Sequence, residues 1–350
     1  MIIYDAADGS RQQNKTKEAL MKLDIIIPHY KEPWATCCYL FNSIAMQRRI
    51  PFENIRCIVV NDGDDESLDS VNFGMFPYEI VYLKKEHGGV SAARNYGLDY
   101  SDADYVMWCD IDDGFLNNYA LHMIFAAMNE GFDYLNSNFA EETLTEKEGA
   151  IVIVGHAADI TFMHGKVYRR EFLVENNLRF DPEMTIHEDG YFNCVAYLTA
   201  LKKGKVKKID TPYYLWCWNG ESTVRKNSED YTLRTYDHVM RARIGIANQL
   251  RDRGYEEDYR DSVGMTVLNS YYDFQKTAWT QAKNEKYYKA AEKEFKKFWN
   301  LFGKVFYDLT NLKVAEIAKV ARENAVKNGM LMEQTDLRTF LKHIENEVKL

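Results

Sequence analysis

Short apolar runs alternate with longer amphipathic segments along the first 110 residues. Four nearly continuous apolar runs predict strands, at residues 23–28, 55–60, 78–84 and 105–109. Two segments with apolar residues at helical spacing predict helices, at residues 34–48 and 90–100. Strands that alternate with helices in this way are typical of a mostly parallel sheet with helices on its faces. The pattern therefore predicts an α/β domain whose functional loops follow the strands along one edge.

The pattern is less regular after residue 150 and changes again after residue 212. The expected elements in between are strands at 151–154, 160–164 and 206–209, and helices at 166–176 and 189–201. All six prolines lie at or before Pro212, and the amphipathic sequence that follows is rich in lysine and glutamate, which favours helices. We therefore expect a polar leader at 1–22, an α/β domain at 23–228 and an all-helical unit at 229–350.

The composition is that of an ordinary globular protein and excludes several classes. No apolar run approaches the roughly 20 residues needed to cross a bilayer, and residues 1–22 lack the apolar segment of a signal peptide. The six cysteines show no metal-ligand spacing and lie mostly in apolar stretches, which favours reduced thiols and a cytoplasmic location. The net charge of −9 disfavours nucleic acid as a partner.

The predicted strand at 105–109 runs directly into three acidic residues, Asp110, Asp112 and Asp113. Crowded carboxylates repel one another, and a hard divalent cation such as Mn2+ or Mg2+ removes that cost. Open α/β sheets bind their ligands at the carboxyl ends of the strands, where these residues are expected. The alternative is a solvated acidic loop that caps the next helix. A metal–phosphate site and a capping loop both remain open on this segment alone.

Three other polar clusters follow predicted strands or precede helices. Asp62 ends the second strand, where it could accept a hydrogen bond from a base or ribose, or form an Asx turn. Arg94 follows a glycine-containing turn and could pair with a phosphate or carboxylate, or belong to a plainly capped helix. Glu188 and Asp189 precede an amphipathic helix, as a general base would or as ordinary capping residues would.

A polar loop with Ser222 and Arg225 follows the aromatic segment at 213–218. Arginine makes bidentate contacts with phosphate oxygens, so this loop could close over a diphosphate. A loop at a domain boundary is the alternative. His164 directly precedes residues 165–170, and a lone histidine of this kind is expected to be structural rather than a ligand.

Together these motifs resemble the inverting nucleotide-sugar glycosyltransferases of family two, which have the GT-A fold. The matching segments, in family order, are 25–30 (IIIPHY), 59–63 (VVNDG), 89–95 (GVSAARN), 110–113 (DIDD), 165–170 (GKVYRR), 187–190 (HEDG) and 222–225 (STVR). The resemblance covers about residues 23–225 and leaves the rest of the chain unassigned.

The resemblance implies a role for each matching position. It implies a nucleotide site, commonly for a uridine diphosphate sugar, that is made of Pro28, Tyr30, Asp62, Arg94, Asp110, Ser222 and Arg225. Asp112 would ligate the Mn2+ or Mg2+ that bridges the diphosphate, with Asp110 shared between ribose and metal. Asp189 would be the catalytic base, and Glu188 its supporting neighbour. The acceptor would be a hydroxyl of a glycan or cell-surface polymer.

Two departures from the family pattern bear on these roles. Lys31 and Glu32 stand where the family often has asparagine, which puts that local contact in doubt. The Gln-x-x-Arg-Trp motif of processive synthases is absent, so transfer of one sugar is expected.

The alternatives to this function are an inactive nucleotide-sugar-binding module and a transferase that acts on modified DNA or protein. Nucleotidyl transfer would need a glycine-rich basic loop after the first strand, and the sequence has none there.

Aromatic residues recur at helical spacing within 287–302, with lysines between them. Such a helix can lie on an anionic membrane surface or pack its aromatic stripe inside the protein. Packing is the favoured interpretation, because the surrounding helices need an apolar partner. An oligomer contact is also open.

Overall fold

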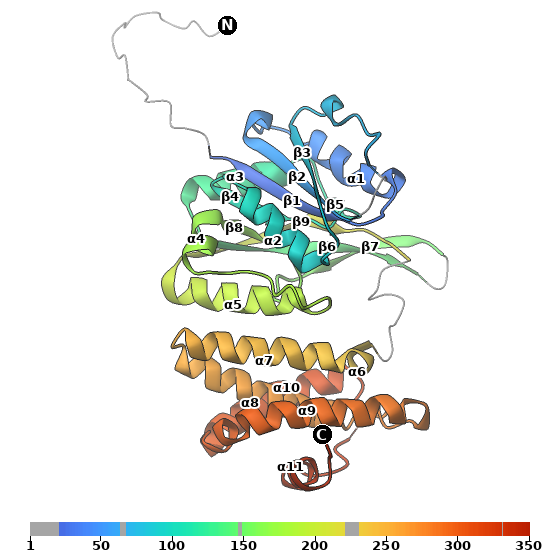
Figure 1. Cartoon of the computed structure of the whole chain (residues 1–350), viewed down its shortest axis with the longest axis vertical. Helices are drawn as coiled ribbons and strands as arrows, with labels where there is room; N and C mark the ends of the chain where they lie inside the picture. Colours follow the sequence, from blue (N-terminus) through green and yellow to red (C-terminus); the bar gives the residue numbers. More distant parts are fainter. Residues whose placement is uncertain (1–20, 64–67, 146–148, 221–230, 331) are drawn as a thin grey trace, which may run out of the picture.

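The computed structural model describes residues 21–63, 68–145, 149–220, 231–330 and 332–350. The leader expected at 1–22 therefore lies outside the described residues, except for its last two positions. Figure 1 shows an α/β layer built around one sheet and a layer of helices stacked beneath it. The first layer holds the polar clusters singled out above.

The described strands form one nine-stranded sheet in the order β3-β2-β1-β4-β8-β6-β9-β5, with β7 paired to β6. Their bounds are β1 Leu23–His29, β2 Ile55–Asp62, β3 Glu79–Lys85, β4 Tyr105–Trp108, β5 Gly114–Phe115, β6 Tyr134–Leu144, β7 Ile151–His156, β8 Val167–Arg169 and β9 Val206–Trp216. Strands β1 to β4 are mutually parallel, as expected. Strand β8 runs antiparallel to both β4 and β6, so the sheet as a whole is mixed.

Helices cover both faces of the sheet. Their bounds in the α/β layer are α1 Trp34–Ala45, α2 Val90–Tyr100, α3 Ala120–Glu130, α4 Arg170–Glu175 and α5 Glu188–Lys203. Alternate residues of β1 and β2 serve two cores: Ile26 and Ile58 face α2 and α5, and Ile25 and Cys57 face α1 and α3. Strands β1, β2 and β4 are thus buried on both faces, which explains their nearly continuous apolar sequence, whereas β3 at the edge of the sheet is only partly buried.

Two local expectations are wrong, and two elements were missed. Residues 160–164 form turns instead of a strand, because Phe162 and His164 stack against each other in an aromatic cluster. The helix expected at 166–176 is strand β8 followed by the short helix α4. Helix α3 and the long strand β6 had no expected counterpart. Strand β6 pairs with three neighbours at the middle of the sheet.

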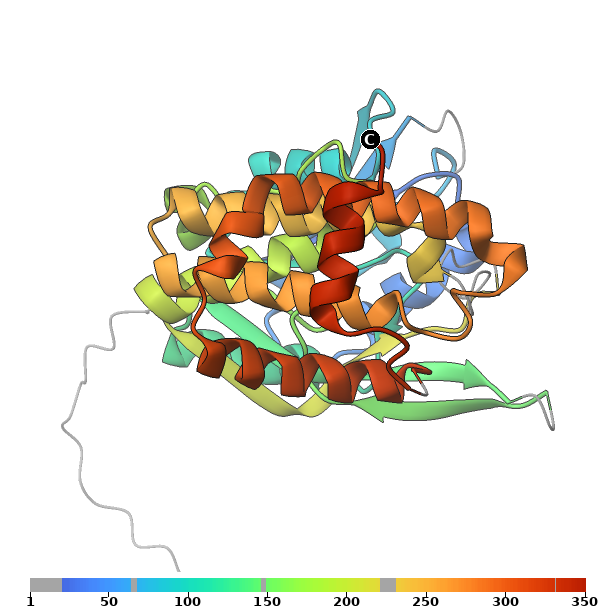
Figure 2. The same cartoon turned by 90° about the horizontal axis from the view of Figure 1, so that it is seen from below.

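The described residues from 231 onward are helical, as expected. Their helices are α6 Tyr231–Arg234, α7 Tyr236–Asp252, α8 Glu256–Asp273, α9 Glu285–Tyr307, α10 Asn311–Lys327 and α11 Leu337–Asn346, and short 3-10 turns lie at Phe52–Asn54, Phe73–Met75 and Ala282–Asn284. The aromatic stripe of α9 is buried, with Phe295, Phe298 and Phe302 nearly inaccessible. Figure 2 shows α9, α10 and α11 from below. No helix in the described part of the chain is both long and apolar enough to cross a membrane.

Helix α7 joins the two layers. It packs along α5, and a Cβ at Gly245 of α7 would lie 2.9 Å from Cε2 of Tyr191 on α5. The buried side chains of α5 and of the helical unit form one continuous apolar cluster. The helical unit is therefore fixed against the helix that carries Glu188 and Asp189.

Helix α2 lies very close to the sheet. A Cβ at Gly97 would lie 2.4 Å from Cγ2 of Ile26 on β1 and 3.3 Å from Cγ2 of Val60 on β2. Only glycine permits this approach, and the approach sets the position of Arg94 one turn earlier in the helix.

We expect Gly97→Ala to lower the free energy of unfolding by about 1–3 kcal/mol, because the added methyl overpacks the contact with Ile26. Urea denaturation of both proteins measures this change. The matched control is Gly155→Ala on β7, where an added methyl meets nothing within 4 Å. Equal stability of the two variants would contradict the close packing of α2.

Candidate active site

A cavity of about 830 Å3, here called the donor cavity, opens at the carboxyl ends of β1, β2 and β4. It is lined by all eight expected site residues that the structure describes: Pro28, Tyr30, Asp62, Arg94, Asp110, Asp112, Glu188 and Asp189. The other two, Ser222 and Arg225, lie outside the described residues. Residues separated by up to 161 positions thus meet at one sheet edge.

Arg94 is the centre of this cavity wall. Its guanidinium donates to Oε1 of Glu188 at 3.0 Å, to Oδ1 of Asp189 at 2.5 Å and to Oδ1 of Asp110 at 2.9 Å. The side chain is only 2% exposed. Burial alone would lower the pKa of Arg94, but the three carboxylates raise it, so the guanidinium stays charged. Arg94 therefore links α2, the end of β4 and the start of α5.

Local backbone geometry brings these groups together. Gly89 enters α2 at φ 84°, a left-handed conformation that glycine tolerates. His187 enters α5 at φ 63°, a conformation uncommon for a residue with a side chain. The turn at His187 directs Glu188 and Asp189 from the first turn of α5 toward Arg94.

Asp189 is a carboxyl group whose pKa is strongly perturbed. Burial raises the pKa of Asp189 to about 8, Arg94 opposes this rise, and the neighbouring Glu188 and Asp110 add to it. A carboxylate whose pKa lies near neutrality can take a proton from a hydroxyl more readily than an ordinary aspartate. The position in the donor cavity and the raised pKa both fit the expected general base.

Asp62 organises the turn that precedes α2. Its carboxylate accepts hydrogen bonds from the backbone N–H groups of Gly88 at 3.0 Å and Gly89 at 2.7 Å, and from Nζ of Lys85 at 2.5 Å. Beside it, the ring of Tyr30 stacks on His87 with centroids 4.5 Å apart. A flat, half-exposed ring at this place could stack a nucleobase.

Two acidic residues after β4 face the donor cavity, and the third is buried. Asp112 accepts from Nδ2 of Asn219 at 2.8 Å, and both Asp112 and Asp110 line the cavity. Asp113 instead accepts from the Tyr214 hydroxyl at 2.6 Å and from the backbone N–H of Cys217 at 3.0 Å. Burial, together with Asp110 and Asp112, raises the pKa of Asp113 well above its usual range. The donor set of Asp110 and Asp112 fits a hard divalent cation.

His164 is a candidate that the sequence analysis set aside as structural. Asp110, Asp113 and His164 offer ligand atoms that lie within 4.8 Å of one another. The Nδ1 atom of His164 is buried with no hydrogen-bond partner among the described residues, and burial lowers the pKa of this side chain to about 3. A neutral imidazole with an unpaired nitrogen can ligate a metal. Its position directly before the segment at 165–170 was the available signal.

The mixed sheet, the carboxylates at its edge and the start of α5 together have the arrangement of a GT-A-like fold. Residues 24–172, somewhat less than half of the chain, match the family model described as "Glycosyl transferase family 2". The resemblance read from the motifs is thereby confirmed.

Two curated bacterial relatives act in teichoic acid synthesis, according to their names. The minor teichoic acid biosynthesis protein GgaB of Bacillus subtilis is 30% identical over 200 residues, which cover 50% of this chain and 21% of the relative. The poly(ribitol-phosphate) beta-N-acetylglucosaminyltransferase TarS of Staphylococcus aureus is 26% identical over 273 residues, which cover 74% of this chain and 45% of the relative. This chain thus spans less than half the length of either protein.

A solved structure supports the fold over most of the chain. The crystal structure of S. aureus TarS 1-349 in complex with UDP-GlcNAc aligns with a TM-score of 0.57 and 19% identity, covering 89% of this chain and 93% of that one. At this identity the match shows the shared fold, including the helical layer.

We expect Arg94→Gln to lower the free energy of unfolding at pH 7 by roughly 3–5 kcal/mol, because it leaves three clustered carboxylates without their buried cation. Urea denaturation measures the change. Arg179→Gln is the matched control, since Arg179 pairs with Asp99 near the surface and its loss should cost at most about 1 kcal/mol. Equal losses in the two variants would contradict the central role of Arg94.

Proposed function

We propose that this protein transfers one sugar from a uridine diphosphate sugar to a hydroxyl of an acceptor polymer, with inversion at the anomeric carbon. The observation that carries the proposal is the placement of Asp189 in the donor cavity, bonded to Arg94 and thereby to Asp110. A base and a diphosphate-binding edge within one cavity are what a single displacement needs.

The uridine end of the donor is proposed to lie against Tyr30, Asp62 and Pro28. The ring of Tyr30 would stack the base, and the cradle around Asp62 would receive the ribose. The solved TarS structures hold UDP and UDP-GlcNAc according to their titles, which supports a UDP-sugar as donor. Ser222 and Arg225 are proposed to cover the diphosphate, as the family resemblance implies.

Asp112 and Asp110 are proposed to hold Mn2+ or Mg2+, with His164 and Asp113 as further candidate ligands. Such an ion, when bound, acts as a Lewis acid and neutralises the charge that develops on the leaving diphosphate. Asp112 keeps its orientation through Asn219, and Asp110 through Arg94. These two hydrogen bonds hold the carboxylates of Asp112 and Asp110 in place before the donor binds.

Asp189 is proposed to take the proton from the attacking acceptor hydroxyl. The oxygen then attacks the anomeric carbon from the face opposite the leaving diphosphate, and the bond to the diphosphate breaks. Glu188 shares the Arg94 guanidinium and helps to hold Asp189 in place. The two carboxylates thus divide into one base and one positioning residue.

The acceptor is proposed to be a polyol-phosphate polymer, because the curated relatives are named for teichoic acid and poly(ribitol-phosphate). Nucleotide sugars are made in the cytoplasm, and we propose that transfer occurs there. An inactive nucleotide-binding module is the competing function, and turnover of a UDP-sugar by the purified protein discriminates between them.

We expect Asp189→Asn to lower the rate of sugar transfer by about 10²–10⁴-fold, because an amide cannot take the proton. UDP affinity, measured by calorimetry, should stay within about twofold, since the cavity keeps its shape. Asp210→Asn is the matched control, because the Asp210 side chain is 81% exposed and does not line the donor cavity. Full activity of the Asp189→Asn variant would contradict the proposed role of Asp189 as the catalytic base.

We expect EDTA to abolish transfer and added Mn2+ or Mg2+ to restore it, because the crowded carboxylates need a cation to bind a diphosphate. Asp112→Asn should raise the Mn2+ concentration required for half-maximal activity. The assay follows UDP release at increasing metal concentration. Transfer that is insensitive to the chelator would contradict the proposed metal role of Asp112.

A further inference from the structure

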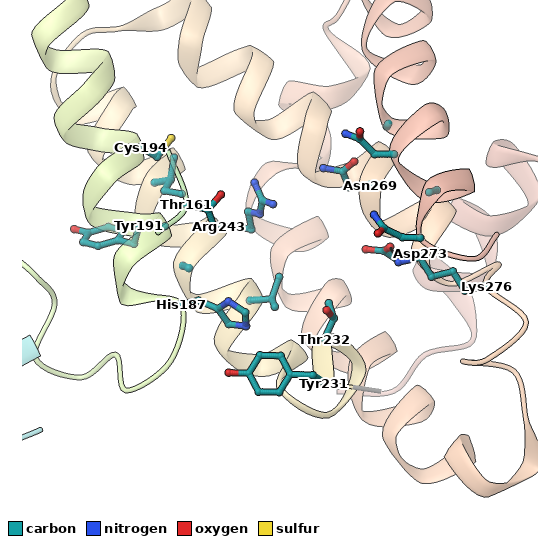
Figure 3. Close-up of a pocket in the computed structure, with 18 of the residues that line it drawn as sticks. Thr161, His187, Tyr191, Cys194, Tyr231, Thr232, Arg243, Asn269, Asp273 and Lys276 are labelled. Carbon is teal, nitrogen blue, oxygen red and sulfur yellow. Dashed lines mark ion pairs between the residues drawn. The ribbon is translucent and has the colours of Figure 1, made fainter. Parts of the chain in front are cut away.

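A second cavity of about 640 Å3 lies between α5 and the helical unit, with walls from α7, α8 and α10. It shares Thr161, His187, Gly190 and Tyr231 with the donor cavity, so the two cavities adjoin. Figure 3 shows its polar side chains arriving from both layers of the molecule. No role assigned so far uses this space.

Arg243 of α7 is the main positive group in the second cavity. Figure 3 shows its guanidinium directed into the space between α5 and the helical unit. Within the described part of the chain it forms no ion pair, although it is half-buried. A half-buried guanidinium without a carboxylate at contact distance is uncommon, because its burial is normally compensated by an anion.

The other polar groups leave the second cavity with a positive balance. Asp273 pairs with Lys276 at 2.6 Å and also interacts electrostatically with Arg243, so two cations in the lining face one carboxylate. Asn269 of α8 also lines the cavity, and its amide makes no hydrogen bond to any described residue. The whole chain, in contrast, has a net charge of −9. The cationic character is therefore local to this cavity.

We propose that the second cavity binds a phosphate group of the acceptor chain through Arg243, while an acceptor hydroxyl lies at Asp189 in the donor cavity. This inference rests on the transfer reaction proposed above. Arginine suits this role, because its planar guanidinium matches two phosphate oxygens. The amide of Asn269 and the hydroxyl of Thr161 would receive the polyol hydroxyls beside the phosphate.

The position of the second cavity agrees with an extended acceptor. His187, in the shared wall, directly precedes Glu188 and Asp189, so a chain lying in the second cavity passes beside the base. A neutral glycan fits this wall less well. Tyr191 and Trp279, two aromatic residues of the lining, are only 9% and 3% exposed and offer little ring surface for sugars.

The test measures binding of a fluorescently labelled ribitol phosphate oligomer by anisotropy, with the full chain saturated with UDP. Arg243→Gln should weaken binding at least about tenfold, since a charge-assisted hydrogen bond is lost. Arg243→Lys, which keeps the charge, should retain part of the affinity. The matched control is Arg251→Gln on the same helix, beside Asp252 and outside the cavity lining, which should leave binding unchanged.

Three further probes decide what the site recognises. A neutral oligosaccharide of equal length should bind no better to the wild type than to Arg243→Gln. If inorganic phosphate depends on Arg243 but the oligomer does not, the site takes free phosphate and the acceptor assignment is wrong. Single-stranded DNA of equal charge that binds as tightly through Arg243 would also overturn it.

The binding result stands apart from the outcome of the transfer assay. Unchanged oligomer affinity in Arg243→Gln, with UDP affinity and thermal unfolding like wild type, overturns the second-cavity site even if transfer occurs. Loss of affinity in that variant supports the site even if a different sugar donor must be found.

Discussion

The guanidinium of Arg94 joins three carboxylates that come from two distant parts of the chain. It bonds Asp110 at the end of β4 and both Glu188 and Asp189 at the start of α5. One cation cannot balance three carboxylates, and Asp112 adds another negative group to the same cavity. The site therefore carries excess negative charge that a divalent cation would offset, while Arg94 keeps the carboxylates in a fixed arrangement. The contacts of Arg94 thus both position the carboxylates and gather the negative charge that a divalent cation would neutralise.

Strands β1, β2 and β4 of the parallel half could be predicted because they are buried on both faces. Their sequences are nearly continuous apolar runs, and polar residues follow each of them directly. Strand β6 was not predicted because polar runs interrupt its apolar residues, at Asn136 to Asn138 and at Glu141 to Thr143. Residues 160–164 misled for the opposite reason: Phe162 and Met163 are apolar but pack from turns. Aromatic clustering of this kind depends on tertiary contacts.

The candidate site was predictable residue by residue where motifs follow strands, but its internal contacts were not. The eight described site residues share a cavity, and Arg94 was expected to pair with a phosphate or a carboxylate, but its simultaneous contact with three carboxylates was not predicted. Asn219 was missed as a partner because an isolated amide carries no spacing signal, and His164 was set aside as structural although it directly precedes a matching motif. The packing of α7 on α5 forms a second cavity beside the donor cavity, so residues of the helical unit line a space that adjoins the candidate site.

The most direct test of the account is the anomeric configuration of the transferred sugar, read by proton NMR. The measurement uses UDP-α-N-acetylglucosamine and a ribitol phosphate oligomer, the donor and acceptor classes in the names of the TarS relatives and structures. A base at Asp189 opposite the leaving diphosphate predicts a β-linked product. An α-linked product would contradict single displacement at this site.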